Sequence, residues 1–404
     1  MTALSRALDT GAIRAEFPLL RRELAGQPIA FLDHASTAPK PRRVIEAIRA
    51  YHERFTANVH RGVHPLAAEA SAAYEAARHA AAVHLGALPG EVVFTRGTTE
   101  ALNLVAASLG LGPEDEVLVT LAEHHSNLLP WRAVAKVVAI GSLPDGTPRW
   151  EELPALLSPR TKLIAVHHAS NVLGTLAPLD ELGRLARERG IPLLVDGAQA
   201  AGHVPVDVSA IGCDFYAFSA HKLGGPTGVG VLYAREPWLS RLRPWHWGGG
   251  MVAKVALSDE ELKEGPHRFE AGTPNVEGVL GLGAALELLR EVGMDEVAAH
   301  GRRLAAALLD VCARLPGVRV LGADDPNRPR IPLVALAIPP GALDAETLAR
   351  TLADTSGVLV SAGRHCAHPL HDHAGADATL RASAWIVNDT DDVERFGQAL
   401  SLLL

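Results

Sequence analysis

A lysine stands between a strand-like segment and a run of glycines in SAHKLGGPTGVG (219–230). Glycines permit positive φ angles and a close approach of the backbone to a ligand. The carboxyl end of a strand is also where open α/β sheets bind ligands. A partly desolvated lysine at this position is a candidate for Schiff-base chemistry, and an exposed loop lysine is the alternative. Only six of the 38 basic residues are lysines, so Lys222 is a prominent candidate.

An aspartate ends another apolar run in PLLVDGAQA (192–200). A carboxylate behind a buried strand is costly unless it has a partner. The pyridinium nitrogen of pyridoxal phosphate (PLP) is such a partner, and PLP sites combine a lysine with a carboxylate near that nitrogen. Asp196 is therefore a candidate cofactor ligand, and the cap of a following helix is the alternative.

Phosphate is bound where donors gather, preferably at the start of a helix. In TRGTTEALNLVAA (95–107) a strand leads into a helix, and Thr98 and Thr99 offer N–H groups and hydroxyls. A plain capping box explains the same pattern and is compatible with phosphate binding. In AEHHSNLLPW (122–131) a histidine could lie over a flat aromatic cofactor, or it could be ordinary loop polarity.

The segment GRHCAHPLHDHAG (363–375) holds one of three cysteines, with four histidines around it. A thiol beside basic groups is favoured as the thiolate, so Cys366 is a candidate reactive residue. An inert surface loop and a Cys/His metal site are the alternatives. Ligands crowded into one loop do not match the spacing of a structural zinc site, so we predict no metal. Cys213 and Cys312 are predicted to be inert core residues.

The elements that must position these residues alternate between strands and helices from about residue 91. Continuous apolar runs are typical of strands covered on both faces. The expected strands are 91–95, 116–120, 136–140, 162–166, 192–196, 214–219 and, as a late and antiparallel addition, 228–234. Helical spacing between them, for example over 178–189, predicts an α/β fold with a mostly parallel sheet of the seven-stranded type.

Residues 240–275 interrupt this pattern, and a smaller α+β domain is expected to follow. The pattern predicts a long helical stretch, then strands and helices in turn, over 276–315, 318–321, 331–338, 344–354, 358–361 and 380–386, with a closing helix. We predict a segment 1–30 that packs with the small domain, a large PLP-binding domain over 31–283, and a small domain over 284–404 that carries the Cys366 loop.

Composition narrows the classes of function. The 404 residues are 48% hydrophobic and 21% charged, which is typical of a globular protein with a sizeable core. The net charge of −8 with no basic block argues against a nucleic-acid or membrane partner. Three widely spaced cysteines and the lack of a signal-peptide pattern predict a cytoplasmic location.

Taken together, the motifs resemble those of fold-type I PLP enzymes of the class V aminotransferase group, and within it group II (SufS-type) cysteine desulfurases. Ten segments match in family order: FLDHAST (31–37), ANVHRGVHPLA (57–67), FTRGTTEALNLVA (94–106), EHHSNLLPW (123–131), HHASNVLGT (167–175), VDGAQA (195–200), DFYAFSAHKLGGPTGVGVLY (214–233), RFEAGTPN (268–275), GRHCAHPL (363–370) and RAS (381–383). A single segment would carry little weight, whereas ten in order cover nearly the whole chain.

The resemblance implies a role for each matched residue. Lys222 resembles the lysine that bonds to PLP and carries the proton, and Cys366 the nucleophile that takes sulfur as a persulfide. The implied contacts to the cofactor are His124 stacked on the ring, Asp196 on its nitrogen, Gln199 and Asn171 near its hydroxyl, and Thr98, Thr99, Ser219 and His221 on the phosphate. Thr273 resembles a phosphate contact donated by the other subunit, which implies a homodimer. The implied substrate contacts are Arg381, Asn171 and His60.

The implied activity is conversion of L-cysteine to L-alanine, with sulfur passed from Cys366 to a SufE- or SufU-type acceptor for iron–sulfur cluster assembly. Related members are selenocysteine lyases, C–S lyases, epimerases and kynureninase-like hydrolases, and a catalytically idle protein that binds a sulfur carrier is the non-enzyme alternative. One position departs from the family pattern. Ser361 stands where group II enzymes usually place an arginine, so either Arg364 supplies the charge or substrate handling has changed.

Overall fold

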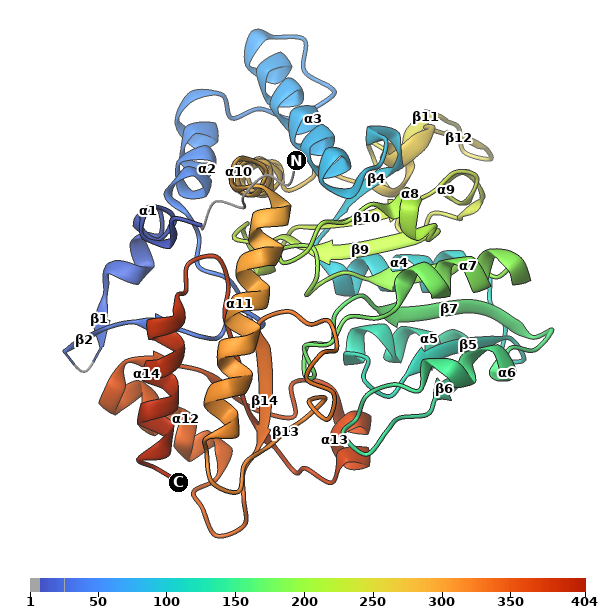
Figure 1. Ribbon diagram of the computed structural model, residues 1–404. Coiled ribbons are helices and arrows are strands. Elements are labelled where there is room, and N and C mark those ends of the chain that lie inside the picture. The colour runs from blue at the N-terminus through green and yellow to red at the C-terminus, as the bar shows by residue number, and fades with distance from the viewer. Residues whose placement is uncertain (1–7, 25) are drawn as a thin grey trace, which may run out of the picture.

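The large sheet forms the centre of the protein in the computed structural model, which describes residues 8–24 and 26–404 (Figure 1). Its seven strands follow the order β4-β10-β9-β8-β7-β5-β6. β10 is antiparallel to both of its neighbours, and the other strand pairs are parallel. The mostly parallel sheet predicted from the sequence is confirmed. The strands are β4 (Val92–Thr95), β5 (Glu116–Thr120), β6 (Lys136–Ile140), β7 (Thr161–His167), β8 (Leu193–Asp196), β9 (Phe215–Ser219) and β10 (Gly230–Ala234).

Helices cover both faces of this sheet, because alternate strand residues point to opposite sides. One core joins strand residues such as Val195 to α2 (Arg42–Arg54), α3 (Pro65–Leu85), α7 (Leu179–Arg189), α8 (Val208–Ile211) and α10 (Val276–Val292). The opposite core joins strand residues such as Leu194 to α4 (Thr98–Ser108), α5 (Leu129–Val134) and α9 (Trp238–Arg241). A short helix, α6 (Leu153–Leu156), follows β6. Burial on both faces explains why the strands are continuous apolar runs.

Helix α7 shows how local sequence sets the ends of an element. Asp180 and Glu181 lie in its first turn, and Arg187 and Arg189 in its last, where each charge complements the helix dipole. Gly190 ends the helix at φ 64°, a conformation that glycine adopts at little cost. The prediction of a helix over 178–189 is confirmed.

A smaller antiparallel sheet lies beside the large one, in the strand order β13-β14-β17-β16. Its strands are β13 (Arg319–Val320), β14 (Leu333–Ala337), β16 (Ser361–Gly363) and β17 (Thr379–Ser383). Apolar residues of β14 and β17 share a core with α11 (Met294–Ala313), α12 (Ala345–Ser356) and α14 (Thr390–Ser401). This arrangement is the α+β unit expected near the C-terminus.

Four predicted elements are corrected by the structure. The helical stretch 276–315 is two helices, because Gly293 at φ 86° separates α10 from α11. The predicted domain boundary after residue 283 therefore falls inside α10, which packs on α2 and α3. The strand 358–361 is divided between β15 (Val358–Leu359), which pairs with β3 (Ala30–Phe31), and β16 in the small sheet.

The other two corrections lie near Cys366. The predicted loop 363–375 contains the helix α13 (His368–Ala374), whose proline lies in the first turn, where proline is tolerated, and whose end is capped by Gly375 at φ 61°. The strand predicted over 380–386 ends at Ser383, because the next residues form a turn in which Trp385 N–H donates to Asn388 Oδ1 at 3.0 Å.

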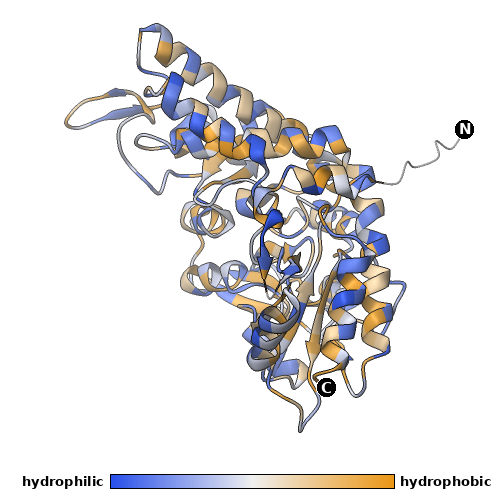
Figure 2. Cartoon of the chain, turned by 90° about the vertical axis from the view of Figure 1, so that its left-hand side faces the viewer, coloured by the Kyte–Doolittle hydropathy of each residue, from blue (hydrophilic) through white to orange (hydrophobic). Residues whose placement is uncertain are grey.

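The N-terminal residues contact both parts of the molecule. Arg14 in α1 (Thr10–Ala15) forms an ion pair of 2.9 Å with Asp392 in α14, whereas Phe17 is part of the large core. Two hairpins, β1 (Glu23–Leu24) with β2 (Gln27–Pro28) and β11 (Val252–Val255) with β12 (Glu260–Leu262), complete the fold. Helices of mixed hydropathy surround the central strands (Figure 2). None of the helices in the described chain is long and apolar enough to cross a membrane.

Candidate active site

A cavity of about 410 Å³ lies at the carboxyl ends of β8 and β9 and is closed on its other side by residues of the small sheet. Eleven of the predicted site residues line it, from four strand ends, one helix start and the small domain. They are Thr98, Thr99, His124, Asn171, Asp196, Gln199, Ser219, His221, Lys222, Cys366 and Arg381. Strand ends of a parallel sheet meet at one edge, which explains why residues so distant in sequence gather here.

Asp196 is buried in this cavity and Lys222 is half-buried, and the attraction between their charges only partly offsets the effect of burial on each pKa. Burial lowers the pKa of Lys222 to about 8, so its amine is easily deprotonated. Burial likewise raises the pKa of Asp196 to about 6. Within the described residues, the Asp196 carboxylate accepts one hydrogen bond, from the Ala198 N–H at 2.9 Å, and Lys222 Nζ has none. The site therefore offers a reactive amine and a carboxylate that lacks a cation.

Hydroxyl groups form a cradle at the start of α4. Ser219 Oγ accepts the Thr98 N–H at 2.8 Å and lies 2.8 Å from Thr98 Oγ1. Thr99 Oγ1 lies 2.7 Å from Ser126 Oγ. The first N–H groups of an 11-residue helix point into the same region. Hydroxyls and a helix start together suit an anion such as phosphate.

A close backbone contact shapes this cradle. A Cβ on Gly230 in β10 would lie 2.4 Å from the Cα of Gly97, the residue that caps α4. Only glycine at position 230 lets the two segments pass at this distance. The lack of a side chain at Gly230 thus allows the start of β10 to lie directly against the start of α4.

Two histidines and a glutamine line the cavity in uncharged form. Burial, with a further contribution from Lys222, lowers the pKa of His124 and His221 to about 4. A neutral imidazole can lie flat against an aromatic ring without the cost of a buried charge. Gln199 Nε2 donates to the Ala35 carbonyl at 2.9 Å and keeps a second N–H for a ligand.

Arg381 on β17 presents a buried guanidinium to the cavity. Its Nη1 donates to the Asn171 carbonyl at 3.0 Å, and its Nη2 donates to Ser36 Oγ at 2.7 Å. Its Nε is buried with no hydrogen-bond partner, and burial lowers the pKa of the guanidinium. Asp33 lies 3.5 Å away and balances part of the charge. An unpaired N–H on a fixed guanidinium fits a carboxylate ligand.

Cys366 is the exposed cysteine of the three, whereas Cys213 and Cys312 are buried, as predicted. Its backbone has φ 55°, and that of the preceding His365 has φ 47°. Two consecutive non-glycine residues in this region are costly, so the surrounding contacts must hold them there. Asn171 Nδ2 donates to the His365 carbonyl at 2.7 Å, and the His125 N–H donates to the Cys366 carbonyl at 2.8 Å. The large domain thereby fixes the thiol at the cavity.

Comparison with known proteins places this geometry in a family. Residues 30–396 match the model of the class-V aminotransferases. The chain belongs to this class-V family. It is 43% identical to a probable cysteine desulfurase of Halalkalibacterium halodurans, with 97% of each chain covered. It is 44% identical to a cysteine desulfurase of Klebsiella pneumoniae, with 95% of each covered.

Solved structures give the same result for the class-V fold. The apo cysteine desulfurase of Thermococcus onnurineus superposes with a TM-score of 0.92 at 35% identity and covers 100% of this chain and 99% of its own. The cysteine desulfurase CsdA of Escherichia coli, in its S-sulfonic acid form, gives a TM-score of 0.88 at 38% identity, over 99% of this chain and 100% of its own. The predicted fold class and family are confirmed.

Pyridoxal phosphate is the cofactor of this class-V family, and the donors described above fit it. The amine of Lys222 is available to the aldehyde, and Asp196 lacks the cation that a ring nitrogen would provide. The hydroxyl cradle at α4 suits the phosphate, and His124 lines the cavity where a ring would lie. Each part of the cofactor thus has a matching group in this chain.

The class-V site contains residues that the sequence reasoning did not select. His167 and Ser36 line the cavity, and Glu123 holds His167 through its Nδ1 at 2.7 Å. Ser36 and His167 lie inside the matched segments FLDHAST and HHASNVLGT, so membership of these segments could have indicated them as site residues. No spacing rule indicates the buried Glu123–His167 pair, because it joins β7 to a loop 44 residues away.

Two of the predicted site residues lie outside the large cavity. His60 and Thr273 line a separate cavity of about 110 Å³, beside the segment that precedes α10. Arg364 also stays outside the large cavity, because it forms an ion pair with Asp372 of α13. Ser361 does line the cavity. Of the two alternatives raised by Ser361, the structure therefore gives no support to a replacement charge from Arg364.

Proposed function

We propose that this protein is a PLP-dependent cysteine desulfurase that converts L-cysteine to L-alanine and takes the sulfur as a persulfide on Cys366. The observation that carries the proposal is the meeting of an exposed thiol and a buried, deprotonatable amine in one cavity: Cys366 from the small domain faces Lys222 from the large one. Relatives that cover nearly the whole chain bear the same name at 42–44% identity.

Bound PLP supplies an electron sink that acidifies the substrate's α-hydrogen. Lys222, whose pKa burial lowers to about 8, is the group placed to hold and return that proton. The guanidinium of Arg381 orients the substrate carboxylate, and its hydrogen bonds to the Asn171 carbonyl and Ser36 Oγ fix its direction. The Cys366 thiolate would attack the substrate sulfur and form the S–S bond of the persulfide, while the bond between that sulfur and the substrate's β-carbon breaks. The electron pair of the broken bond stays with the carbon skeleton, which takes up a proton to become alanine.

The test is incubation of the PLP-loaded protein with L-cysteine and a reductant, followed by measurement of sulfide and alanine together. Equal amounts of both products are expected, and none of either from Cys366→Ser, in which bound PLP should remain visible by absorbance. Cys213→Ser is the matched control, because that thiol is buried. Sulfide release by Cys366→Ser at the unmodified rate would refute the proposal and favour another PLP lyase. Failure to bind PLP would favour the non-enzyme alternative.

The partners follow from the same site. An exposed Cys366 can be reached by a SufE- or SufU-type sulfur acceptor, and the position of Thr273 in a separate cavity supports a homodimer in which this residue serves the neighbouring site. Three cysteines without a disulfide support a cytoplasmic location.

A further inference from the structure

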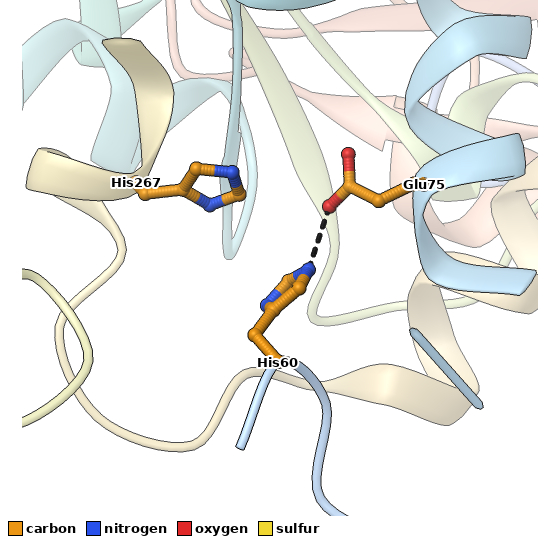
Figure 3. A group of neighbouring side chains, drawn as sticks. All are labelled: His60, Glu75 and His267. Carbon is orange, nitrogen blue, oxygen red and sulfur yellow. Dashed lines mark hydrogen bonds and ion pairs between the residues drawn. The ribbon is translucent and has the colours of Figure 1, made fainter. Parts of the chain in front are cut away.

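Three side chains from separate segments point toward one another at the surface of α3 (Figure 3). His60 precedes α3, Glu75 lies on it, and His267 lies in the short 3₁₀ helix Gly265–Phe269. His60 Nε2 is 2.8 Å from Glu75 Oε1, and the two histidine rings are 5.0 Å apart between centroids. One ligand atom from each residue lies within 4.8 Å of the others, the single group of this kind among residues 8–24 and 26–404.

The carboxylate of Glu75 is held in a fixed direction. Its Oε2 accepts from Arg78 Nε at 2.9 Å, and its Oε1 contacts Arg78 Nη2 at 3.4 Å and, on the side of the histidines, His60 Nε2 at 2.8 Å. Arg78 is buried and also pairs with Glu270 at 2.7 Å. Glu75 and Glu270 thus share one guanidinium, and the cavity beside them is also lined by Arg61 and Lys263.

His267 is poised for a ligand that the protein does not provide. Its ring makes no hydrogen bond to the described residues, and its Nδ1 lies 3.9 Å from Glu270 Oε2. The side chain is 34% exposed and lines the cavity of about 110 Å³ together with His60 and Thr273. A fourth ligand could enter the group from this cavity.

We propose that His60, Glu75 and His267 bind one Zn²⁺ ion, with a fourth position open to water or an anion in the cavity. Two imidazoles and one carboxylate are a ligand set that zinc uses when it keeps an open position. Zinc ligands at bond lengths of about 2.0–2.2 Å lie about 3.3 Å apart. The three ligand atoms now lie within 4.8 Å of one another, so side-chain rotation must bring the most distant pair closer by up to about 1.5 Å. No metal was predicted from the sequence, because the ligands near Cys366 are crowded into one loop; the three residues of this group, in contrast, are spread over residues 60–267.

The ion would join three segments that no covalent link connects. It would tie the loop before α3 and the segment that leads to Thr273 onto the side of α3. This site is separate from the Lys222 cavity and does not depend on the proposed reaction.

The test uses the full PLP-loaded protein, freed of metal with a chelator and titrated with Zn²⁺. One tightly bound zinc per chain is expected by elemental analysis, and Co²⁺ in its place should give visible absorption bands of low coordination number. His267→Ala should weaken Zn²⁺ binding more than about 100-fold, since loss of even an outer partner costs about 10–100-fold. His246→Ala, an exposed histidine outside the group, is the matched control and should bind zinc unchanged.

Cys366→Ser tests whether the zinc binds instead at Cys366 and the histidines around it. We expect this variant to bind zinc as the unmodified protein does. His267→Gln, which keeps the side-chain size, replaces His267→Ala if the latter fails to fold, as judged by circular dichroism and PLP absorbance. The proposal is overturned if the unmodified protein takes up no zinc, if the His267 variants bind it equally well, or if binding is lost in Cys366→Ser and kept in His267→Ala.

Discussion

At the scale of single residues, the cavity holds ionisable groups in states that water would not favour. Lys222 is partly neutral near pH 8, and Asp196 resists ionisation up to about pH 6, in both cases because of burial. Each group lacks a partner that PLP provides: the amine lacks a carbonyl carbon, and the carboxylate lacks a ring nitrogen. Bound PLP would supply both missing partners and so offset the free-energy cost of burying these groups. A lysine and an aspartate at the ends of apolar strands could therefore be recognised from the sequence as candidate PLP ligands.

Lys222 should set the pH dependence of cofactor attachment. In cofactor-free protein, the rate of covalent PLP binding should rise as the pH passes about 8 and then level off, because the neutral amine is the reactive form. An ordinary lysine would show this rise near pH 10.4. The measurement is the change in PLP absorbance after mixing at a series of pH values. Lys222→Ala should show no covalent attachment and no sulfide release, and persistent turnover would place the reactive lysine elsewhere.

Asp196→Asn should retain some PLP and lose most of its activity. An amide cannot keep the ring nitrogen protonated, so we expect a loss of about 100- to 1000-fold in sulfide release, about 3–4 kcal/mol of transition-state stabilisation. Steady-state kinetics with L-cysteine measure this loss. An unchanged rate would contradict the role given to Asp196.

The same variant has an opposite effect on the stability of the cofactor-free protein. The folded pKa of about 6 lies above the ordinary aspartate pKa of 3.8, so the stabilising contribution of Asp196 is present below pH 3.8 and is lost as the pH rises through 6. Asp196→Asn should therefore raise the free energy of unfolding at pH 7 by up to about 3 kcal/mol and change it little at pH 4. Urea unfolding at both pH values provides the comparison.

Arg364→Ala should leave sulfide release and the KM for L-cysteine within about threefold of the unmodified values. Arg364 pairs with Asp372 outside the cavity, and an exposed ion pair contributes only about 0–1 kcal/mol. Arg381→Ala is the contrasting variant, because its buried guanidinium lines the cavity and is proposed to bind the substrate carboxylate. A large rise in KM for Arg364→Ala would show that this residue does replace the family arginine.

At the scale of elements, the sequence predicted best where an element is buried on both sides. All the large-sheet strands were found as continuous apolar runs, and β8 and β9 end at Asp196 and Ser219, as expected. Since such strand ends converge, the predicted residues around the cavity could be grouped without coordinates. The antiparallel β10 was also anticipated from its position directly after β9.

The sequence failed where an element depends on a few backbone angles or on distant contacts. Helix α13 was missed because histidine, proline and glycine suggest a loop, although its proline and Gly375 occupy positions that helices tolerate. The break at Gly293 leaves no gap in the apolar periodicity of 276–315. The group of His60, Glu75 and His267 depends on three segments meeting in space, which no spacing in the chain reports.

Gly230→Ala tests whether the close contact between β10 and the start of α4 supports the phosphate cradle. The added Cβ would lie 2.4 Å from the Cα of Gly97, so one segment must move. We expect a destabilisation of about 1–3 kcal/mol and weaker PLP binding. Gly90→Ala is the control, because a Cβ there meets nothing within 4 Å. Unchanged PLP affinity in Gly230→Ala would show that the cradle does not depend on this contact.

At the scale of the whole molecule, the predicted phosphate residues divide between two cavities. Thr98, Thr99 and Ser219 line the large one, whereas Thr273 lines the small one. A single chain thus does not bring all the predicted contacts together. If Thr273 does serve the cofactor, it must do so in a second copy of the chain, which makes a symmetric dimer the unit that binds PLP fully.

A mixture of two inactive variants tests this assembly. Thr273→Asp should repel the phosphate in the neighbouring site, and Lys222→Ala removes the reactive amine from its own site. In a heterodimer of the two, one site receives both defects and the other receives none, because Lys222 and Thr273 come from different chains. Co-refolding at equal concentrations should therefore restore about a quarter of the active sites, since half of the dimers are mixed and each has one intact site. Sulfide release measures the recovery, and sedimentation confirms the dimer.

A matched mixture of Lys222→Ala with Asp196→Asn should recover far less, because those residues share a chain's own cavity and only the reduced activity of Asp196→Asn remains. Recovery no greater than in that control, or full activity in a monomer, would place Thr273 outside the neighbouring site.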